Sequence, residues 1–402
     1  MNNLLIFALL FVAIATGWLL GRRARSTTMV APELPSEYYK GLNYLLDGRP
    51  DGAIDAFIQA LEVNSETLET HIALGNLLRK KGEVDRAIRI HQNLLARPSL
   101  PRSQVHQAHL ELARDYISAG LLDRAERLLL ELVVDSPEQR RTSQRHLLEI
   151  YQSERDWQRA TEIATQLLPR KSILGGSSGE MAAEERPQVL VALSHYYCEM
   201  GQEKLKQGEL KEARQLLQRA LGHDKCCVRA SIMLGDVECR SGRYKQAIKA
   251  LRKIRSQDPE FIPETIAILR QCHRELGDEQ ALKTYLAECV SSNPSATLVL
   301  AVAEDIRQSE GNAVAGEFLS TQLAKRPSLR GLSRLISLQM DATDGKARDN
   351  LDLLQVLVNR LVAERPVYRC IHCGFGGRQL HWFCPGCKCW GTMKTINGPR
   401  DE

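Results

Sequence analysis

The sequence predicts a mostly α-helical protein built from an N-terminal transmembrane helix, a superhelix of helix-turn-helix repeats and a small C-terminal four-cysteine tab that binds a metal. Three observations predict this architecture: an uncharged stretch opens the chain, a spacing of 34 residues recurs through its middle, and two Cys-x-x-Cys pairs stand near its end. With 43% hydrophobic and 26% charged residues, the 402-residue chain can bury a core. The net charge of +5 is too small to indicate nucleic-acid binding.

The first predicted element is a membrane anchor. The stretch Leu4 to Leu20 holds no charged residue, and as a helix it is about 26 Å long, just enough to span a bilayer. A cleaved signal peptide is the alternative, with a small-residue site at Ala13 to Ala15, but no basic residue precedes the stretch and its apolar character continues past that site. Three arginines follow at Arg22, Arg23 and Arg25. The positive-inside rule therefore places the rest of the chain in the reducing cytoplasm.

The second element is a repeat array. Gly41, Gly48 and Ala53 recur 34 residues later as Gly75, Gly82 and Ala87, and further copies follow, many closing on a proline. The pattern resembles the tetratricopeptide repeat. Small residues at the eighth and twentieth positions let two helices touch, and the glycine at the fifteenth position ends the first helix. Stacked repeats form an extended concave face that typically binds peptides or helices.

The expected boundaries follow from these patterns. The Gly/Ser-rich segment at 171–186 reads as a flexible loop, either a hinge or a tolerated insertion, inside an array of about eight repeats. The predicted parts are an anchor at 1–21, a juxtamembrane linker at 22–34, the array at 35–330, a helical cap at 331–364 and the tab at 365–402.

The array carries no catalytic motif, so we expect a protein that is not an enzyme. The chain contains no phosphate loop, nucleophile elbow or His-Glu-x-x-His sequence. Its helical histidines are scattered and read as surface or packing residues: His71, His91, His106, His109 and His146. Six array cysteines lack ligand spacing and read as buried small hydrophobes or free thiols, with a redox pair at Cys226 and Cys227 as an alternative: Cys198, Cys226, Cys227, Cys239, Cys272 and Cys289.

The tab has the spacing of a metal site. Two Cys-x-x-Cys turns are separated by ten residues, and each turn can present two thiolates to one ion. The predicted ligands are Cys370, Cys373, Cys384 and Cys387. Four thiolates leave no open position for substrate water, which argues against metal-catalysed hydrolysis. Disulfides are the alternative, Cys389 is a possible substitute ligand, and His372 and His381 read as bystanders.

The two turns resemble the knuckles of rubredoxin, which binds one iron ion through four cysteines. The resemblance rests on Tyr-x-Cys-x-x-Cys-Gly-Phe from Tyr368 to Phe375 and Cys-Pro-x-Cys from Cys384 to Cys387. The spacer is much shorter than in rubredoxin, and Lys388 stands where rubredoxin has glycine. We expect one iron ion, while tetrahedral sulfur ligation also suits zinc.

Nearly the whole chain resembles the lipopolysaccharide assembly protein B (LapB, or YciM) family. The resemblance rests on the predicted anchor followed by Gly-Arg-Arg, on the amino-acid sequence of the second repeat from Gly75 to Gln92, and on the C-terminal YRCxxCGF and WFCPxC motifs. It implies an adaptor at the cytoplasmic face of the cell inner membrane that promotes degradation of the deacetylase LpxC by the membrane protease FtsH. It also implies contacts with other lipopolysaccharide synthesis or transport proteins, and it leaves open whether the chain forms a homodimer.

Two rival functions remain from the residues alone. An electron carrier would use the tab as a one-electron iron centre docked through the repeats. A zinc-ribbon nucleic-acid binder would need a basic stripe with interleaved aromatics, and the few basic residues around Trp382 and Trp390 are too sparse to favour it.

Overall fold

The computed structural model divides into two compact units, residues 1–139 and 140–402. It describes residues 14–16, 18, 36–47, 49, 52, 53, 56, 68–96, 100–168, 185–341, 343–363 and 365–396. Most of the predicted anchor at Leu4 to Leu20 lies outside these residues, as does nearly all of the predicted loop at 171–186. None of the helices in the described ranges is long and apolar enough to cross a membrane.

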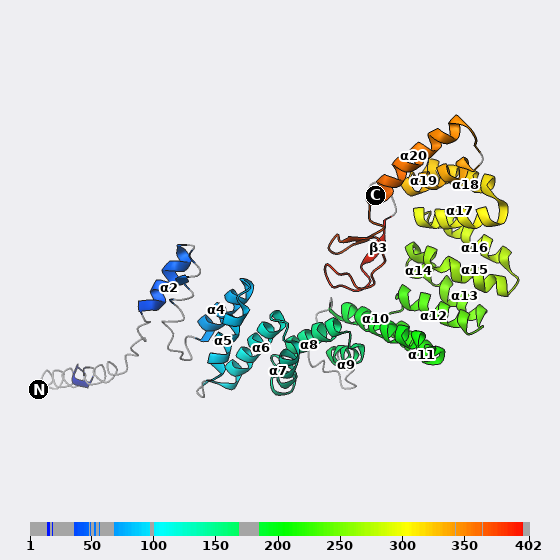
Figure 1. Ribbon diagram of the computed structural model, residues 1–402. Coiled ribbons are helices and arrows are strands. Elements are labelled where there is room, and N and C mark those ends of the chain that lie inside the picture. The colour runs from blue at the N-terminus through cyan, green and yellow to red at the C-terminus, as the bar shows by residue number, and fades with distance from the viewer. Residues whose placement is uncertain are drawn as a thin grey trace, which may run out of the picture. The chain divides into compact units, whose positions relative to one another are not determined.

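Unit 1 is a run of helices that pack in sequence order (Figure 1). Each helix after α4 packs against the one before it, which is how a helix-turn-helix repeat buries its apolar face. The described helices are α2 (Ser36–Leu46), α4 (Leu68–Lys80), α5 (Val84–Leu95), α6 (Arg102–Ser118) and α7 (Leu122–Asp135).

Unit 2 continues the same arrangement and ends in a small antiparallel sheet of order β2-β1-β3. Its first helices are α8 (Arg140–Glu154), α9 (Trp157–Leu167), α10 (Glu185–Lys206), α11 (Leu210–His223), α12 (Val228–Arg240), α13 (Tyr244–Arg252) and α14 (Ile254–Gln257). The 3-10 helix η1 (Pro259–Thr265) precedes α15 (Ile266–Glu275), α16 (Glu279–Ser292), α17 (Ala296–Glu310), α18 (Asn312–Lys325), α19 (Leu329–Met340) and α20 (Lys346–Ala363). The strands are β1 (Tyr368–Cys370), β2 (Gly376–Gly377) and β3 (Met393–Thr395).

Two predicted boundaries differ slightly from these bounds. Helix α10 begins at Glu185, so the last two residues of the loop expected at 171–186 are helical, with Pro187 in the first turn where proline is tolerated. Helix α19 begins at Leu329, two residues before the expected start of the cap, because Ser328 accepts a hydrogen bond from the backbone N–H of Gly331 and caps the helix. The mostly helical repeat fold with a four-cysteine tab is confirmed.

The glycine at the fifteenth repeat position does turn the chain. Gly82 (φ 86°) and Gly242 (φ 73°) adopt the left-handed conformation two residues after the last residue of α4 and α12, respectively. The fourth copy has Arg155 at this position, and it adopts the same conformation with φ 59°. Because a side chain is strained there, the conformation is imposed by the repeat and not by the residue.

The glycine at the eighth position marks a close helix contact. A Cβ built on Gly75 would lie 2.4 Å from the His91 ring, and one on Gly235 would lie 2.4 Å from Leu251. In both repeats the obstructing side chain is sixteen residues later, on the second helix. The alanine at the twentieth position is fully buried in the same repeats, at Ala87 and Ala247.

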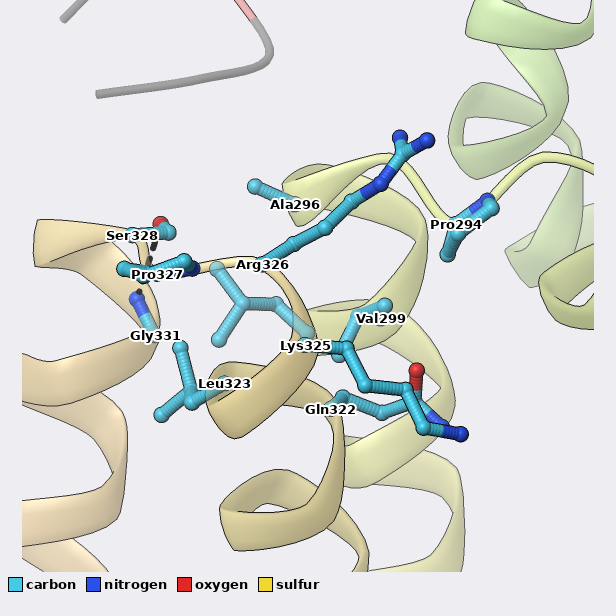
Figure 2. Close-up of a pocket in the computed structure, with 11 residues that line it drawn as sticks. Pro294, Ala296, Val299, Gln322, Leu323, Lys325, Arg326, Pro327, Ser328 and Gly331 are labelled. Atoms are coloured by element: carbon cyan, nitrogen blue, oxygen red, sulfur yellow. Dashed lines mark hydrogen bonds between the residues drawn. The ribbon is translucent and has the colours of Figure 1, made fainter.

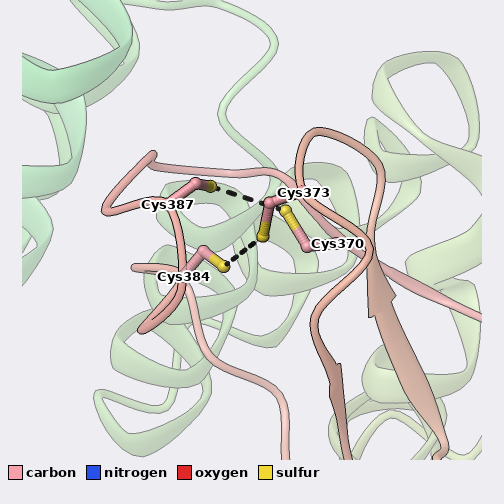
Figure 3. A group of neighbouring side chains, drawn as sticks. All are labelled: Cys370, Cys373, Cys384 and Cys387. Carbon is pink, nitrogen blue, oxygen red and sulfur yellow. Dashed lines mark hydrogen bonds between the residues drawn. The ribbon is translucent and has the colours of Figure 1, made fainter. Parts of the chain in front are cut away.

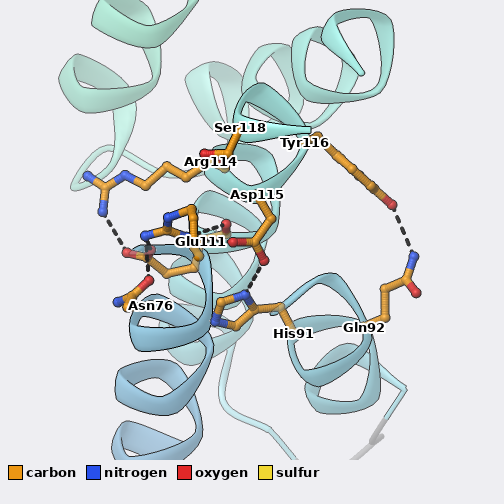
Figure 4. Close-up of polar contacts among 9 residues, drawn as sticks. Asn76, His91, Gln92, Glu111, Arg114, Asp115, Tyr116 and Ser118 are labelled. Carbon is orange, nitrogen blue, oxygen red and sulfur yellow. Dashed lines mark hydrogen bonds and ion pairs between the residues drawn. The ribbon is translucent and has the colours of Figure 1, made fainter. Parts of the chain in front are cut away.

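A buried polar network occupies the contact between α5 and α6 (Figure 4). His91 and Asp115 are both fully buried, and His91 Nδ1 lies 2.5 Å from Asp115 Oδ2. Arg79 pairs with the other Asp115 oxygen at 2.7 Å and with Glu111 at 2.8 Å. This His has a structural partner, in agreement with its interpretation as a packing residue, and the pairing compensates for burying the carboxylate.

Candidate metal centre

The first knuckle of the tab is a tight turn closed by backbone hydrogen bonds. Strands β1 and β2 pair with Arg369 opposite Gly376, and between them Cys370 N–H donates to the Phe375 carbonyl at 2.8 Å. Gly374 N–H donates back to the Cys370 carbonyl at 3.0 Å, with Gly374 at φ 77°. The turn therefore holds Cys370 and the side chain three residues later on the same side.

The second knuckle repeats these bonds. Cys384 N–H donates to the Cys389 carbonyl at 2.9 Å, and Lys388 N–H donates to the Cys384 carbonyl at 2.9 Å. Lys388 adopts φ 56° and so takes the left-handed position that Gly374 takes in the first knuckle. The substitution of lysine for glycine noted in the sequence leaves the knuckle geometry unchanged.

The two knuckles bring four sulfur atoms together (Figure 3). The Sγ atoms of Cys370, Cys373, Cys384 and Cys387 all lie within 4.8 Å of one another. Cys370 Sγ lies 3.7 Å from Cys387 Sγ, and Cys373 Sγ lies 3.7 Å from Cys384 Sγ. A tetrahedron with metal–sulfur bonds of about 2.3 Å has edges of about 3.8 Å, so the arrangement fits one four-coordinate ion. Iron and zinc both suit this donor set.

The groups around the four sulfur atoms favour the thiolate form of one buried cysteine, Cys370. Burial opposes ionisation of Cys370, but its hydrogen bond with Thr392 and those from the backbone N–H groups of Cys373 and His372 outweigh it and lower the pKa of this thiol to about 6. Burial, with the neighbouring thiols, raises the pKa of Cys387 to about 11. Without a cation four adjacent thiols cannot all ionise, whereas a bound cation favours the thiolate form of each.

A second group of donors shares one of these cysteines. His372, Cys387 and Cys389 also present ligand atoms within 4.8 Å of one another, and no further group of this kind is found in the described part of the chain. This second group offers three donor atoms, whereas the four-cysteine group offers four. Because Cys387 belongs to both, only one of the two groups can bind an ion through it. Cys389 Sγ instead lies 3.5 Å from the Cys387 carbonyl. The approach of His372 to Cys389 carried no signal in the sequence, where the two are seventeen residues apart.

The tab packs against the array through Trp390. Its ring stacks on His195 with centroids 4.9 Å apart and meets Trp157 edge-on at 5.9 Å. The indole N–H donates to Gln152 Oε1 at 3.0 Å. Burial, and to a smaller extent the positive charge of Arg229, lowers the pKa of His195 to about 3. The ring is therefore neutral, and it provides a flat aromatic surface on which Trp390 stacks.

A second set of contacts anchors the tab to η1. Trp382 stacks on Phe261 with centroids 5.3 Å apart, and Lys394 forms an ion pair with Asp258 while its ammonium lies 5.3 Å from the centroid of the Phe261 ring. Tyr368 donates its hydroxyl hydrogen to Glu264 at 3.1 Å. The two tryptophans that a nucleic-acid binder would use for stacking thus pack on the protein itself.

The remaining array cysteines occupy the interior. All are buried except Cys226, which is exposed, so the expectation of buried small hydrophobes fits five of the six. Cys227 is a buried neighbour of Cys198, and the hydrogen bond from Cys198 lowers the pKa of Cys227 to about 7. No metal-binding group includes these residues in the part of the chain that the structure describes.

A pocket of about 300 Å³ lies where α17, α18 and α19 meet (Figure 2). Its apolar lining includes Val299, Leu300 and Leu323, and the exposed Lys325 and Arg326 also border it. Its lining contains no cysteine, histidine or carboxylate, and the one hydroxyl, of Ser328, caps α19 by accepting from the Gly331 backbone N–H.

Comparisons with known proteins match both parts of the fold. Residues 70–105 and 204–264 match the tetratricopeptide repeat, and residues 368–395 match the rubredoxin metal binding domain. Lipopolysaccharide assembly protein B of Escherichia coli K12 is 36% identical over 397 residues, covering 98% of each chain. The protein of that name from Haemophilus influenzae is 34% identical over 405 residues, again covering 98% of each chain.

Solved structures resemble this chain only weakly. A crystal structure of MamA protein aligns with 49% of this chain and 95% of its own at 18% identity, with a TM-score of 0.32. A likeness at that level supports no conclusion about this chain.

Proposed function

The chain belongs to the lipopolysaccharide assembly protein B family, and on that premise we propose that it is a non-enzymatic adaptor in lipopolysaccharide assembly at the cytoplasmic face of the inner membrane. In this proposal it promotes proteolysis of the LpxC deacetylase by FtsH and coordinates other inner-membrane lipopolysaccharide synthesis or transport proteins. The observation that carries the proposal is relatedness along 98% of the chain, which includes the predicted anchor segment, the array and the tab.

The adaptor role is supported by what the array offers chemically. Stacked helical repeats present surface to protein partners, and the array shows no constellation of nucleophile and base in its described residues. Anchoring through Leu4 to Leu20 would hold the adaptor in the plane where a membrane protease also lies, which raises their effective concentration without any new contact.

For the tab we propose that Cys370, Cys373, Cys384 and Cys387 hold one metal ion, iron as in rubredoxin, with zinc as the other ion that fits. When bound, the ion supplies a positive charge that keeps four thiolates together. The chain's own residues then hold the tab on the array: Trp390 covers His195, and Lys394 pairs with Asp258.

The central experiment measures LpxC half-life after protein synthesis is blocked, in cells with and without this chain. We expect deletion to lengthen the half-life, and restoration of the full chain to shorten it again. An unchanged half-life on deletion would refute the proposal. The matched control is a strain with inactive FtsH, in which deletion should have no further effect on LpxC.

The metal is tested separately by loading the purified chain with iron or with zinc. An adaptor needs only the folded tab, so both forms should restore LpxC turnover in an FtsH reaction. An electron carrier would require a reversible Fe(III)/Fe(II) couple, so activity of the iron form alone would favour that alternative.

A further inference from the structure

The last helix of the array, α20, leaves an apolar stripe uncovered. Its inner side packs on α19: Val358 is buried, and Gln355 donates to Ser333 Oγ at 2.9 Å. On other sides of the helix four leucines are between 48% and 62% exposed: Leu353, Leu354, Leu357 and Leu361. Figure 1 shows α20 as the outermost helix at that end of unit 2.

The spacing makes these leucines one continuous surface. Leu353, Leu357 and Leu361 follow each other at intervals of four residues and so lie on one side of the helix, with Leu354 beside them. A repeat array usually ends in a capping helix with a polar outer face, because nothing stacks on it. Helix α20 instead has exposed leucines on its outer face, like an internal helix of an array that packs against the next repeat. None of the described residues covers these leucines.

We propose that a second copy of this chain covers the stripe, with the two α20 helices packed antiparallel across a two-fold axis. Three of its four leucines are symmetric about Leu357, since Leu353 and Leu361 lie four residues to either side. Reversing the helix direction therefore places leucines opposite leucines. A two-fold interface requires such self-complementarity, because the same patch must serve both partners.

The charges beside the stripe support the antiparallel direction. Asp349 and Arg360 are exposed on the same flank of the stripe, toward opposite ends of the helix. In the part of the chain that the structure describes, neither has a side-chain hydrogen bond or ion pair. An antiparallel two-fold pair brings the same flank of both helices together, with the acidic end of one toward the basic end of the other, whereas a parallel pair would place the two flanks on opposite sides of the interface.

The same charges argue against a lipid surface as the occupant. Helix α20 has three basic residues and two acidic ones, a net charge of only +1, and its polar residues are not enriched in lysine and arginine. A helix that binds an anionic membrane surface needs a clear basic excess. A second copy therefore fits the pattern better than a bilayer.

The first experiment is cysteine crosslinking of the full chain in native membranes, in a Cys226→Ser background that removes an exposed thiol. We expect Leu357→Cys to crosslink to itself, and a mixture of Leu353→Cys and Leu361→Cys chains to crosslink to each other more than either does alone. The matched control is Val134→Cys on α7, which is 74% exposed and should not crosslink. Equal self-crosslinking at all three α20 positions would overturn the antiparallel arrangement.

The second experiment exchanges the flanking charges in the detergent-solubilised full chain. Asp349→Arg or Arg360→Asp alone should weaken dimerisation by about tenfold in sedimentation, and the double variant should restore it. Leu357→Asp should weaken it by about 100-fold or more while helix content and metal content stay unchanged, because Leu357 is exposed in the single chain. A monomer at every concentration for the unmodified chain, or cysteines at 353 and 357 that react only with a lipid-soluble maleimide, would refute the proposal.

Discussion

The repeat array and the tab turn their chains with the same backbone conformation but are stabilised by different forces. In both regions a left-handed residue ends a segment, Gly82 after α4 and Gly374 in the first knuckle. The array then buries apolar side chains repeat after repeat. The buried residues of the tab's own cluster are only Cys370, Cys384 and Met393.

The difference shows how a short segment can be part of a large repeat protein. A segment of about thirty residues is far too small to fold by burial alone, so it depends on a metal and on the surface it packs against. The array needs neither, because each repeat is covered by its neighbours. Removing single groups from each region tests this contrast.

The largest effect should follow loss of a metal ligand. Cys370→Ser or Cys384→Ser should abolish metal binding and unfold the tab, since a structural site of this kind contributes about 10 to 16 kcal/mol to folding in small metal-binding peptides. Metal analysis and tryptophan fluorescence would detect this, while helical circular dichroism of the array should be nearly unchanged. Cys389→Ser is the control and should keep its metal. Full metal occupancy in both ligand variants would contradict the assignment.

The next effect concerns the contact between the two regions. Trp390→Ala should destabilise the docked tab by about 2 to 4 kcal/mol, because Trp390 is partly buried against His195 and Trp157. The metal should stay bound, since Trp390 is not a ligand. Limited proteolysis measures how readily the tab separates from the array, because a separated tab is cleaved faster. Ile371→Ala is the matched control, because Ile371 is 71% exposed and its removal should change little. Equal protection of both variants would show that the stacking is unimportant.

Acid should weaken the same contact. His195 has a pKa of about 3 in the fold against 6.5 when unfolded, so the unfolded chain takes up the proton first as pH falls. The stability is complete above pH 6.5 and declines from there toward pH 3, by about 2 kcal/mol between pH 7 and pH 5. Urea unfolding at both pH values measures it. His195→Gln should lose this part of the pH dependence and retain the part due to the other titrating groups; an identical slope in both proteins would exclude His195 as the source.

Within the array, two glycine-to-alanine substitutions should change the free energy of unfolding in opposite directions. Gly235→Ala places a Cβ 2.4 Å from Leu251 and should cost about 1 to 3 kcal/mol through overpacking. Gly222→Ala meets nothing within 4 Å in helix α11 and should stabilise by up to about 1 kcal/mol. Thermal unfolding of the array distinguishes the two. A similar loss in both would indicate that the close contact at Gly235 relaxes easily.

The smallest effect should be an increase in the stability of the tab. Lys388→Gly removes a side chain from a left-handed position and should stabilise the second knuckle by about 0.5 to 1 kcal/mol. Gly374→Ala, at the equivalent place in the first knuckle, should act in the opposite direction. The rate of metal release to a chelator reports both. Faster release from Lys388→Gly would mean that the lysine side chain has a role of its own.

The sequence predicted the features whose determinants are local. Cys370 and Cys373 are three residues apart, so their shared turn could be predicted from spacing, and the repeat period followed from glycines at fixed intervals. The sequence also identified Lys388 as the unusual residue of the second knuckle, although only the structure gives its left-handed backbone.

The contacts between distant segments could not be predicted in this way. Trp390 meets Gln152 across 238 residues, and no local pattern marks either residue as a partner. The pairing of His91 with Asp115 was equally hidden, because the sequence showed His91 only as one of several scattered helical histidines. Such contacts depend on how helices are placed in space, which the spacing of residues along one helix does not encode.

The long separation between Trp390 and Gln152 also has a consequence for synthesis of the protein. At about 5 to 20 residues per second, a ribosome needs about 12 to 48 s to make the 238 residues between them. For most of that time the surface around His195 and Trp157 is made but uncovered, whereas the repeats can already stack. A prematurely terminated chain would keep this aromatic surface exposed, and chaperones or proteases could distinguish it from the finished protein.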